Sequence, residues 1–393
     1  MKKFVALLLA LAMVFVLGCT PSKPSETEPA QPEKVIKAGL ICLHDENSTY
    51  DLNFINAFKA ACEAEGVEYI IKTGIDESNA CYEAAADLVD QGCNFVFADS
   101  FGHESYMIIA AQEFTDVQFC HATGTRAHTE KLANYHNAFA SIYEGRYLAG
   151  VAAGLKLNEI GGTKMGYIGA FTYAEVISGY TSYYLGAKSV CPDVTMEVIF
   201  TGSWYDEAKE KEAAEKLISD GCVLISQHAD SMGAPTACEN AGVPNVSYNG
   251  STISACPNTF IVSSRINWEP YFHYAFDAMR KGEEIAVDYV GTIDTESVQL
   301  TAVNEKAAAK GTVEKLEEVK AKLIKGEIHV FDIETFTVQG EKMLSYKADV
   351  DSDDAYTPDT EVIVDGYFNE SVYRSAPYFD LQIDGIHLQN SAF

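Results

Sequence analysis

Short apolar runs alternate with stretches of helical spacing along the first half of the chain. We predict four buried strands, at 35–43, 69–71, 95–98 and 117–120. We predict three helices between them, at 51–65, 79–91 and 104–114. Apolar strands that alternate with helices indicate βαβ units and a parallel sheet covered by helices on both faces.

The same pattern restarts in the second half. We predict helices at 143–157, 177–190 and 206–220, and strands at 164–169, 195–200 and 223–226. The halves also share small residues at matching places. Gly92-Cys93 and Gly221-Cys222 each lead into a strand that ends in a polar cluster. These similarities indicate two lobes of one architecture.

The arrangement of such lobes predicts a binding cleft. Ligands of open α/β sheets bind outside the carboxyl ends of the strands, so two facing sheets place both sets of strand-end loops around one cleft. The pattern therefore predicts a hinged, two-lobed protein that closes on its ligand. We assign 35–123 with about 266–293 to the first lobe, 124–265 with about 294–335 to the second, and 336–393 to a C-terminal extension.

The N-terminus has the features of an export signal. Two lysines precede an apolar run from Phe4 to Leu17, which is about the length of a signal-peptide core. The small Gly18 before Cys19 resembles a lipobox. We therefore expect residues 1–18 to be a cleaved signal peptide and the Cys19 thiol to be acylated.

The segment after Cys19 is predicted to be a tether. Residues 19–34 are rich in Pro, Ser, Glu and Thr, a composition typical of a disordered linker. Lipidation would hold the protein on the extracytoplasmic face of the cell membrane through its lipid anchor alone. The alternative is an ordinary cleaved signal that happens to be followed by a cysteine.

A Gly-x-x-x-Gly spacing occurs later in the chain, at Gly150 and Gly154. Such a spacing occurs in membrane helix dimers, but Glu144, Arg146 and Lys156 bracket this one closely. We expect the two glycines to pack a helix of the second lobe against a sheet.

The composition excludes some classes of binding partner. The chain of 393 residues has a formal net charge of −29, and such an acidic surface repels nucleic acid and anionic headgroups. Of its ten cysteines, those other than Cys19 lack the C-x-x-C spacing of zinc or redox sites. Most lie inside apolar runs, so we predict free, buried thiols that act as small hydrophobic residues. One or two disulfides are the alternative.

Sequence motifs of catalysis are absent from the chain. It contains no nucleophile elbow, no His-Glu-x-x-His motif and no glycine-rich phosphate loop. We therefore expect no catalytic residue, no metal ion and no cofactor. The prediction is a monomer that binds a small molecule.

Six segments resemble one family of transport proteins. They are 143–154, 165–169, 176–180, 186–188, 201–206 and 227–230, which include a glycine-rich helix and a Thr-Gly-Ser-aromatic turn. Between about Val35 and Gly282 the chain resembles the basic membrane protein (BMP) family of solute-binding lipoproteins, whose best-known members bind purine nucleosides. The resemblance implies an α/β periplasmic-binding-protein type I fold with two Rossmann-like lobes. It also implies an ABC permease and its ATPase as partners.

Several positions depart from the pattern of that family. The family's first loop usually has two aspartates, a variable residue and then Ser-Phe-Asn, whereas Tyr50 here stands for the phenylalanine and Asp51 for the asparagine. A family aspartate falls at Asn249, and a family lysine falls near Arg265. The tail from about Phe331 also extends beyond the usual family end. These departures leave nucleoside specificity open.

Aromatic residues in strand-end loops are the first candidates for ligand contact. A flat heteroaromatic ligand is held best between aromatic faces, and Tyr50 and Trp204 offer one face from each lobe. Phe101 is a further candidate. The alternative for Tyr50 and Trp204 is packing within their own loops, and for Phe101 it is packing in the core.

Polar candidates accompany these aromatic residues. Around Tyr50 they are Asp45, Asn47 and Asp51, and in the second lobe they are His228, Asp230, Asn249 and Arg265. Carboxylates and amides make in-plane hydrogen bonds that suit ribose hydroxyls or ring nitrogens. Asp51 could instead cap the helix that follows, in competition with Ser48 or Thr49. His228 could be a structural hydrogen-bonding residue.

The functional prediction is a solute-binding lipoprotein of an ABC importer. Its expected ligand is a nucleoside, a nucleobase or a related heteroaromatic molecule. A sugar receptor of the same fold is one alternative. A lipoprotein that senses a ligand and signals to a membrane receptor is the other.

Overall fold

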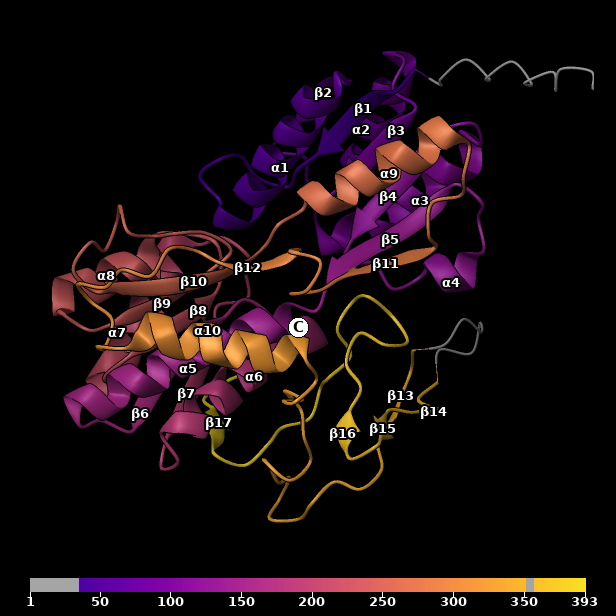
Figure 1. The fold of residues 1–393 in the computed structure, drawn as a ribbon. Coiled ribbons are helices and arrows are strands. Elements are labelled where there is room, and N and C mark those ends of the chain that lie inside the picture. The colour runs from indigo at the N-terminus through magenta and orange to yellow at the C-terminus, as the bar shows by residue number, and fades with distance from the viewer. Residues whose placement is uncertain (1–34, 351–356) are drawn as a thin grey trace, which may run out of the picture. The chain divides into compact units, whose positions relative to one another are not determined.

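The computed structural model describes residues 35–350 and 357–393 (Figure 1). The predicted signal peptide, the predicted acylation site at Cys19 and the predicted linker lie outside the described residues. Within the described residues, none of the helices combines the length and the apolar character that a membrane span requires.

The first lobe is built on a six-stranded parallel sheet with the order β11-β5-β4-β3-β1-β2. Its strands are β1 (Lys37–Ile41), β2 (Glu68–Lys72), β3 (Phe95–Ala98), β4 (Gln118–Ala122), β5 (Tyr135–Ala140) and β11 (Asp288–Gly291). Its helices are α1 (Thr49–Glu65), α2 (Asn79–Asp90), the 3₁₀ turn η1 (Phe101–His103), α3 (Glu104–Glu113), α4 (Ala127–Glu130) and α9 (Glu269–Lys281).

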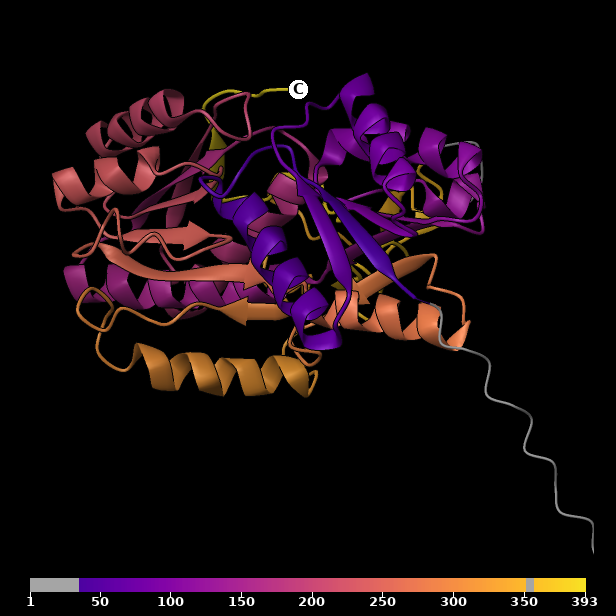
Figure 2. The same cartoon turned by 90° about the horizontal axis from the view of Figure 1, so that it is seen from above.

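Strand β3 shows why this sheet is covered on both faces. Phe95 and Phe97 belong to a core cluster with α1 and α9, whereas Val96 and Ala98 belong to a cluster with α2 and α3. Successive side chains of a strand point to opposite faces, so a continuous apolar run requires helices on both sides. Figure 2 shows helices flanking the sheets.

The second lobe contains a seven-stranded sheet with the order β12-β10-β9-β8-β6-β7-β17. Its strands are β6 (Lys164–Gly169), β7 (Thr195–Phe200), β8 (Ile225–His228), β9 (Asn245–Tyr248), β10 (Phe260–Ile266), β12 (Val298–Leu300) and β17 (Ile386–Leu388). Its helices are α5 (Ile142–Ile160), α6 (Ala174–Val190), α7 (Glu207–Ser219), α8 (Gly233–Ala241) and α10 (Thr312–Ile324). Strand β12 runs antiparallel to β10, and the other pairs are parallel.

The predicted fold class is confirmed, but the first lobe boundary at residue 124 is wrong. Strand β5 pairs with β4 and β11 of the first sheet, so the chain first crosses to the second lobe between Ala140 and Ile142. Polar residues hid this strand from the apolar pattern. All six of its residues are buried. The two polar side chains can be buried because both are hydrogen-bonded: His136 to Gln118 at 2.8 Å, and Asn137 Oδ1 to the Ala127 N–H at 3.0 Å.

The glycines of α5 pack against a helix and not, as predicted, against a sheet. A Cβ atom added to Gly150 would lie 1.9 Å from the carbonyl oxygen of Tyr183, and one added to Gly186 would lie 2.0 Å from that of Tyr147. Both distances fall far inside van der Waals contact. Glycine is therefore required where α5 and α6 lie backbone against backbone.

The nine described cysteines are free and buried, as predicted. Cys42, Cys120 and Cys222, for example, lie at or beside strands of the two sheets, where small apolar side chains fit.

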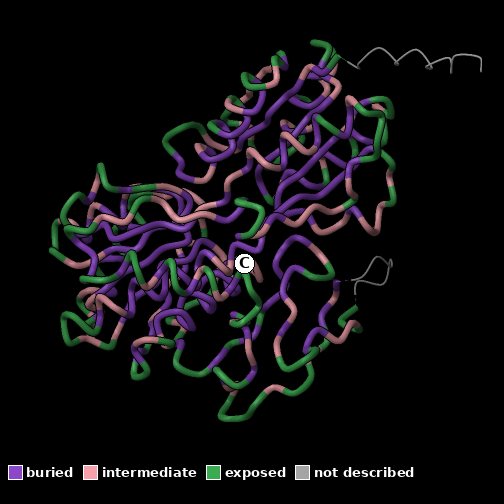
Figure 3. The backbone as a smooth tube through the Cα atoms, in the orientation of Figure 1, coloured by how far each residue is buried: buried purple, intermediate pink, exposed green. Residues whose placement is uncertain are grey.

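The chain beyond α10 covers an edge and contacts both lobes. Its short strands are β13 (Lys347–Ala348), β14 (Thr360–Glu361), β15 (Ile363–Val364), β16 (Tyr367–Phe368) and β17. Strand β17 pairs in parallel with β7 of the second lobe, while the Ser375 N–H donates to Asp288 Oδ2 of β11 in the first lobe at 2.7 Å. Figure 3 shows buried segments of this tail among exposed ones.

Candidate ligand-binding pocket

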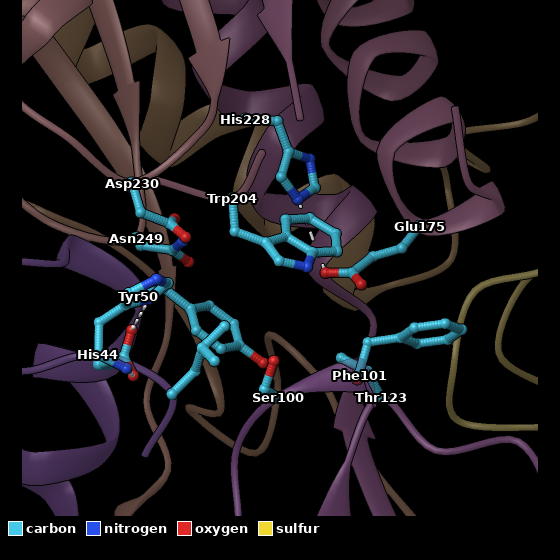
Figure 4. Close-up of a pocket in the computed structure, with 12 residues that line it drawn as sticks. His44, Tyr50, Ser100, Phe101, Thr123, Glu175, Trp204, His228, Asp230 and Asn249 are labelled. Atoms are coloured by element: carbon cyan, nitrogen blue, oxygen red, sulfur yellow. Dashed lines mark hydrogen bonds and ion pairs between the residues drawn. The ribbon is translucent and has the colours of Figure 1, made fainter. Parts of the chain in front are cut away.

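A partly open cavity lies between the two lobes, with about 380 Å³ of empty space that includes some open to solvent (Figure 4). The first lobe lines it with Leu43, His44, Tyr50, Asp51, Ser100, Phe101 and Thr123, and the second with Glu175, Trp204, His228, Asp230 and Asn249. These residues lie in or after the loops at the carboxyl ends of the strands of both sheets. The cavity therefore occupies the place where open α/β sheets bind ligands.

The loop between β1 and α1 shapes one wall of the cavity. Ser48 is the N-cap of α1 and accepts the Asp51 N–H, and its hydroxyl donates back to Asp51 Oδ2 at 2.5 Å. Asp51 Oδ1 also accepts the His44 N–H at 2.8 Å. Burial opposes ionisation of Asp51, but hydrogen bonds from His44 and Ser48 outweigh it and lower the pKa of this carboxyl.

Tyr50 is held so that its ring faces the cavity. Its hydroxyl donates to the Asp99 carbonyl oxygen at 2.7 Å, and its ring packs edge-on against Phe54, with 4.9 Å between centroids. The hydrogen bond satisfies the only polar atom of the side chain, so the ring acts as an apolar face.

Trp204 offers a face from the opposite lobe. Its turn contains Gly202, whose φ of +71° favours glycine, and Thr201 Oγ1 donates to the Ser203 carbonyl at 2.9 Å. The indole packs edge-on against Phe171 at 5.1 Å between centroids. Figure 4 shows Tyr50 and Trp204 on different sides of the same space.

Phe101 contributes to the contact between the lobes. Its ring lies 5.4 Å from that of Tyr173 in the second lobe, and it is 39% exposed. Figure 4 shows the ring directed away from the other lining side chains. Phe101 therefore borders the cavity but does not form its centre.

His228 and Glu175 form one end of the cavity. His228 Nε2 lies 3.6 Å from Glu175 Oε1, and its ring lies 4.4 Å from that of Tyr248. Burial lowers the pKa of His228 despite the neighbouring carboxylate, so the imidazole is neutral near pH 7. His228 therefore does not offer Glu175 a positive charge.

Asp230 and Asn249 form a hydrogen-bonded pair beside α1. Asn249 adopts φ of +66°, which asparagine tolerates, and its Nδ2 donates to Asp230 Oδ1 at 3.3 Å. Burial, with the negative charges of Asp51 and Glu210, raises the pKa of Asp230 well above its usual value.

A buried acidic group lies behind Tyr50. Ligand-type atoms of Cys42, Asp51 and Asp99 lie within 4.8 Å of one another, and within the described residues this is the one group that could together hold a metal ion. Burial and the charge of Asp51 raise the pKa of Asp99 well above its usual value. A neutral Asp99 and an ionised Asp51 can lie this close together without a cation between them.

Three of the predicted site residues lie outside the cavity lining. Asp45 and Asn47 are exposed and bond to each other, with 2.9 Å between Asn47 Nδ2 and Asp45 Oδ1. Arg265 donates to Gln299 at 2.6 Å and to Asn53 of α1 at 3.4 Å. It therefore links the hinge strands to the first lobe.

The other seven predicted residues do line the cavity, and sequence reasoning missed five. Tyr50, Asp51, Phe101, Trp204, His228, Asp230 and Asn249 come together as expected. Leu43, His44, Ser100, Thr123 and Glu175 were missed. The first four directly follow strands, so the strand-end rule could have found them. Glu175 lies in the first turn of α6, where no sequence signal marks it.

Helix α1 also docks against the second lobe beside the cavity. The Thr49 N–H donates to the Asp230 carbonyl at 3.1 Å, and Asn53 Nδ2 donates to the Asn249 carbonyl at 2.7 Å. These contacts hold the lobes in a closed arrangement.

Comparison with known proteins identifies relatives of this chain. A family model described as "Bmp: ABC transporter substrate-binding protein PnrA-like" matches residues 44–334. A purine-binding protein of Brucella abortus is 33% identical over 248 residues, or 62% of this chain and 68% of that protein. A putative ABC transporter glucose-binding protein of Haloferax volcanii is 32% identical over 200 residues, or 51% of this chain and 49% of that protein.

Solved structures share the fold. An ABC transporter solute-binding protein of Conexibacter woesei aligns with a TM-score of 0.62 at 21% identity, over 75% of this chain and 98% of that one. At this identity the likeness concerns the fold alone.

Proposed function

The chain belongs to the Bmp family of PnrA-like ABC transporter substrate-binding proteins, and from this premise we propose that it captures a nucleoside, a nucleobase or a related heteroaromatic solute. The observation that carries the proposal is the pair of aromatic faces, Tyr50 and Trp204, which line one cavity from opposite lobes. Stacking on aromatic side chains stabilises a bound base by about 1–3 kcal/mol.

The ligand would then be delivered to an ABC permease and its ATPase. In this proposal the protein is an extracytoplasmic, monomeric lipoprotein, cleaved before Cys19 and tethered by the acylated thiol. Its family consists of substrate-binding proteins. We propose binding without catalysis and without a metal ion or cofactor.

A sugar is the second candidate ligand. The relative from Haloferax volcanii is named as a putative glucose-binding protein, which favours this reading. Aromatic faces with nearby carboxylates and amides also suit the apolar faces and hydroxyl groups of a sugar ring.

A thermal-shift screen of the purified protein distinguishes these ligands. The panel contains purines, pyrimidines, their nucleosides and common sugars. A ligand at about 100 times its dissociation constant stabilises the folded state by about 2.7 kcal/mol, so it raises the melting temperature by several degrees. A shift with sugars alone would overturn the heteroaromatic proposal and keep the sugar reading.

Replacing the second-lobe face tests the site itself. We expect Trp204→Ala to weaken binding of the ligand found in the screen by roughly 5- to 150-fold, since about 1–3 kcal/mol of stacking is lost. Isothermal titration calorimetry measures the change. Tyr373→Ala, at an exposed ring in the tail, is the control and should bind like the parent protein. Equal affinity of Trp204→Ala and the control would mean that the ligand lies elsewhere.

A further inference from the structure

The cavity lining contains three carboxyl groups and two histidines. Among the lining residues, Asp51, Glu175 and Asp230 carry carboxyl groups, and neither lysine nor arginine is present. Two more carboxyl groups lie just behind this lining. Asp99 follows β3, and its backbone carbonyl accepts the Tyr50 hydroxyl. Glu210 of α7 accepts the Ser231 N–H at 3.3 Å. The cavity is thus surrounded by acidic groups.

One arginine, Arg146, is buried among aromatic rings near His228. Its guanidinium lies 4.7 Å from the ring centroid of Tyr248 and 5.3 Å from that of Tyr167. One of its nitrogens donates to the Tyr167 hydroxyl at 2.5 Å. The Tyr248 ring also packs against His228, so it contacts both Arg146 and a lining residue. The positive charge of Arg146 adds to the effect of burial in lowering the pKa of His228.

The lining carboxyl groups differ in how far their neighbours satisfy them. Asp51 is occupied by Ser48 and by the backbone of His44. Glu175 faces the imidazole of His228, which burial keeps neutral. The carboxyl group of Asp230 accepts one hydrogen bond, from Asn249. Glu175 and Asp230, both from the second lobe, therefore have no lysine or arginine partner within the described residues.

We infer that the cavity selects a cationic heteroaromatic solute and rejects anionic ones. The inference rests on the proposed function and names the substrate class of the same site. A positive ring between Tyr50 and Trp204 gains cation–π attraction at their faces and lies beside the carboxyl groups of Glu175 and Asp230. A cation at this place also favours ionisation of Asp230, whose pKa is raised by burial and by the neighbouring negative charges. A phosphate or carboxylate in the same space would meet these carboxyl groups with neither lysine nor arginine among the lining residues, which is unfavourable away from water.

Pairs of nearly identical nucleosides isolate the effect of charge. In neutral buffer 1-methyladenosine carries a positive ring, whereas its isomer N6-methyladenosine and the nucleoside 1-methylinosine are neutral. The methyl group of 1-methylinosine is at the same ring position as that of 1-methyladenosine. A pyridine pair, N1-methylnicotinamide and neutral nicotinamide, repeats the comparison without a ribose. Adenosine monophosphate provides the anion.

Calorimetric titration of the full chain with these probes gives distinct outcomes. We expect the cation of at least one pair to bind about tenfold tighter than its neutral partners, and the monophosphate to show no binding. Equal or tighter binding of the neutral members, or binding of the monophosphate, would overturn the charge inference and keep the proposed function. Absence of binding by every heteroaromatic probe, charged or neutral, would overturn the proposed function itself.

Two variants assign the effect to its residues. Glu175→Gln and Asp230→Asn keep the shape of each side chain but remove the carboxyl group that can ionise, and each should weaken binding of the cation about tenfold while changing the neutral isomer little. Glu212→Gln, at an exposed position of α7, is the matched control. A purely structural role would weaken both isomers equally, and that result would contradict the assignment.

Discussion

Tyr50 and Asp51 are neighbours in the sequence but have different roles in the fold. Tyr50 presents its ring to the cavity, whereas Asp51 is tied to the capping network of α1 through Ser48 and the backbone of His44. The sequence allowed either role for Asp51, because a short acidic side chain before a helix suits both a cap and a ligand contact. Only the hydrogen-bond partners decide between them.

Glu370 allows a test of buried charge at the residue scale. It lies in the tail, 2% exposed, with Oε1 accepting the Tyr378 N–H at 2.9 Å and no hydrogen-bond partner for Oε2. Burial raises the pKa of this carboxyl from 4.5 to about 8. Between these two values the folded state holds a proton that the unfolded chain releases, so its contribution to stability is lost as the pH rises.

We therefore predict that Glu370→Gln reduces the pH dependence of stability. In the parent protein, this group alone lowers the free energy of unfolding by roughly a few kcal/mol between about pH 5 and pH 8. The variant has no titrating group at this position, so it should lose much less stability over that range. Urea unfolding at both pH values measures the difference. An unchanged pH dependence would show that Glu370 does not titrate in this range.

Among the helices and strands, the predicted bounds agree best with the structure where the apolar pattern is clearest. Strands β3, β6 and β7 begin and end where predicted, because each is a continuous or strictly alternating apolar run between polar turns. Strand β5 was missed because His136 and Asn137 interrupt its run. Their side chains are satisfied by groups distant in sequence, which no local pattern shows.

The C-terminal residues offer a prediction at the element scale. The side chain of Asn390 bonds to the N–H and carbonyl of Phe200, and Ala392 exchanges two hydrogen bonds with Thr172. These contacts hold the loops that lead to Trp204 and Glu175. Deletion of 389–393 should leave the fold intact but weaken ligand binding up to about tenfold, since each lost hydrogen bond contributes about 0.5–1.5 kcal/mol.

A shorter deletion is the control for that experiment. Phe393 is 84% exposed, so its removal alone should leave affinity unchanged. Calorimetry with the ligand from the screen compares the two. Parent-like affinity after deletion of 389–393 would show that the loops keep their shape without this support.

For the whole molecule, α1 supplies hydrogen bonds that join the two lobes beside the cavity. Asn53 lies at the centre of these contacts, because it donates to the Asn249 carbonyl and accepts from Arg265. We predict that Asn53→Ala favours the open arrangement without removing a lining side chain, since Asn53 is not among the lining residues. A ligand that binds the closed state would then bind more weakly, because binding must also supply the free energy of closing.

Solution scattering and calorimetry check that prediction. The ligand-free variant should have a larger radius of gyration than the parent protein and a roughly three- to tenfold lower affinity, or about 0.7–1.4 kcal/mol. Asn56→Ala, at an exposed position one turn further along α1, is the control. A variant with parent-like size and affinity would mean that Asn53 does not stabilise closure.

The sequence by itself determined the class of the fold and the aromatic residues of the candidate site. Apolar periodicity is a local property, and strand-end loops of parallel sheets meet at one edge whatever their length, so Tyr50, Trp204 and Asp230 could be placed together. The tertiary structure decided the lobe of β5, the fit of α5 on α6, and the position of Glu175 beside His228. It also placed the Arg146 guanidinium among the rings of Tyr248 and Tyr167. These features depend on side chains far apart in the chain, whose burial and charge are set only when both sheets are packed.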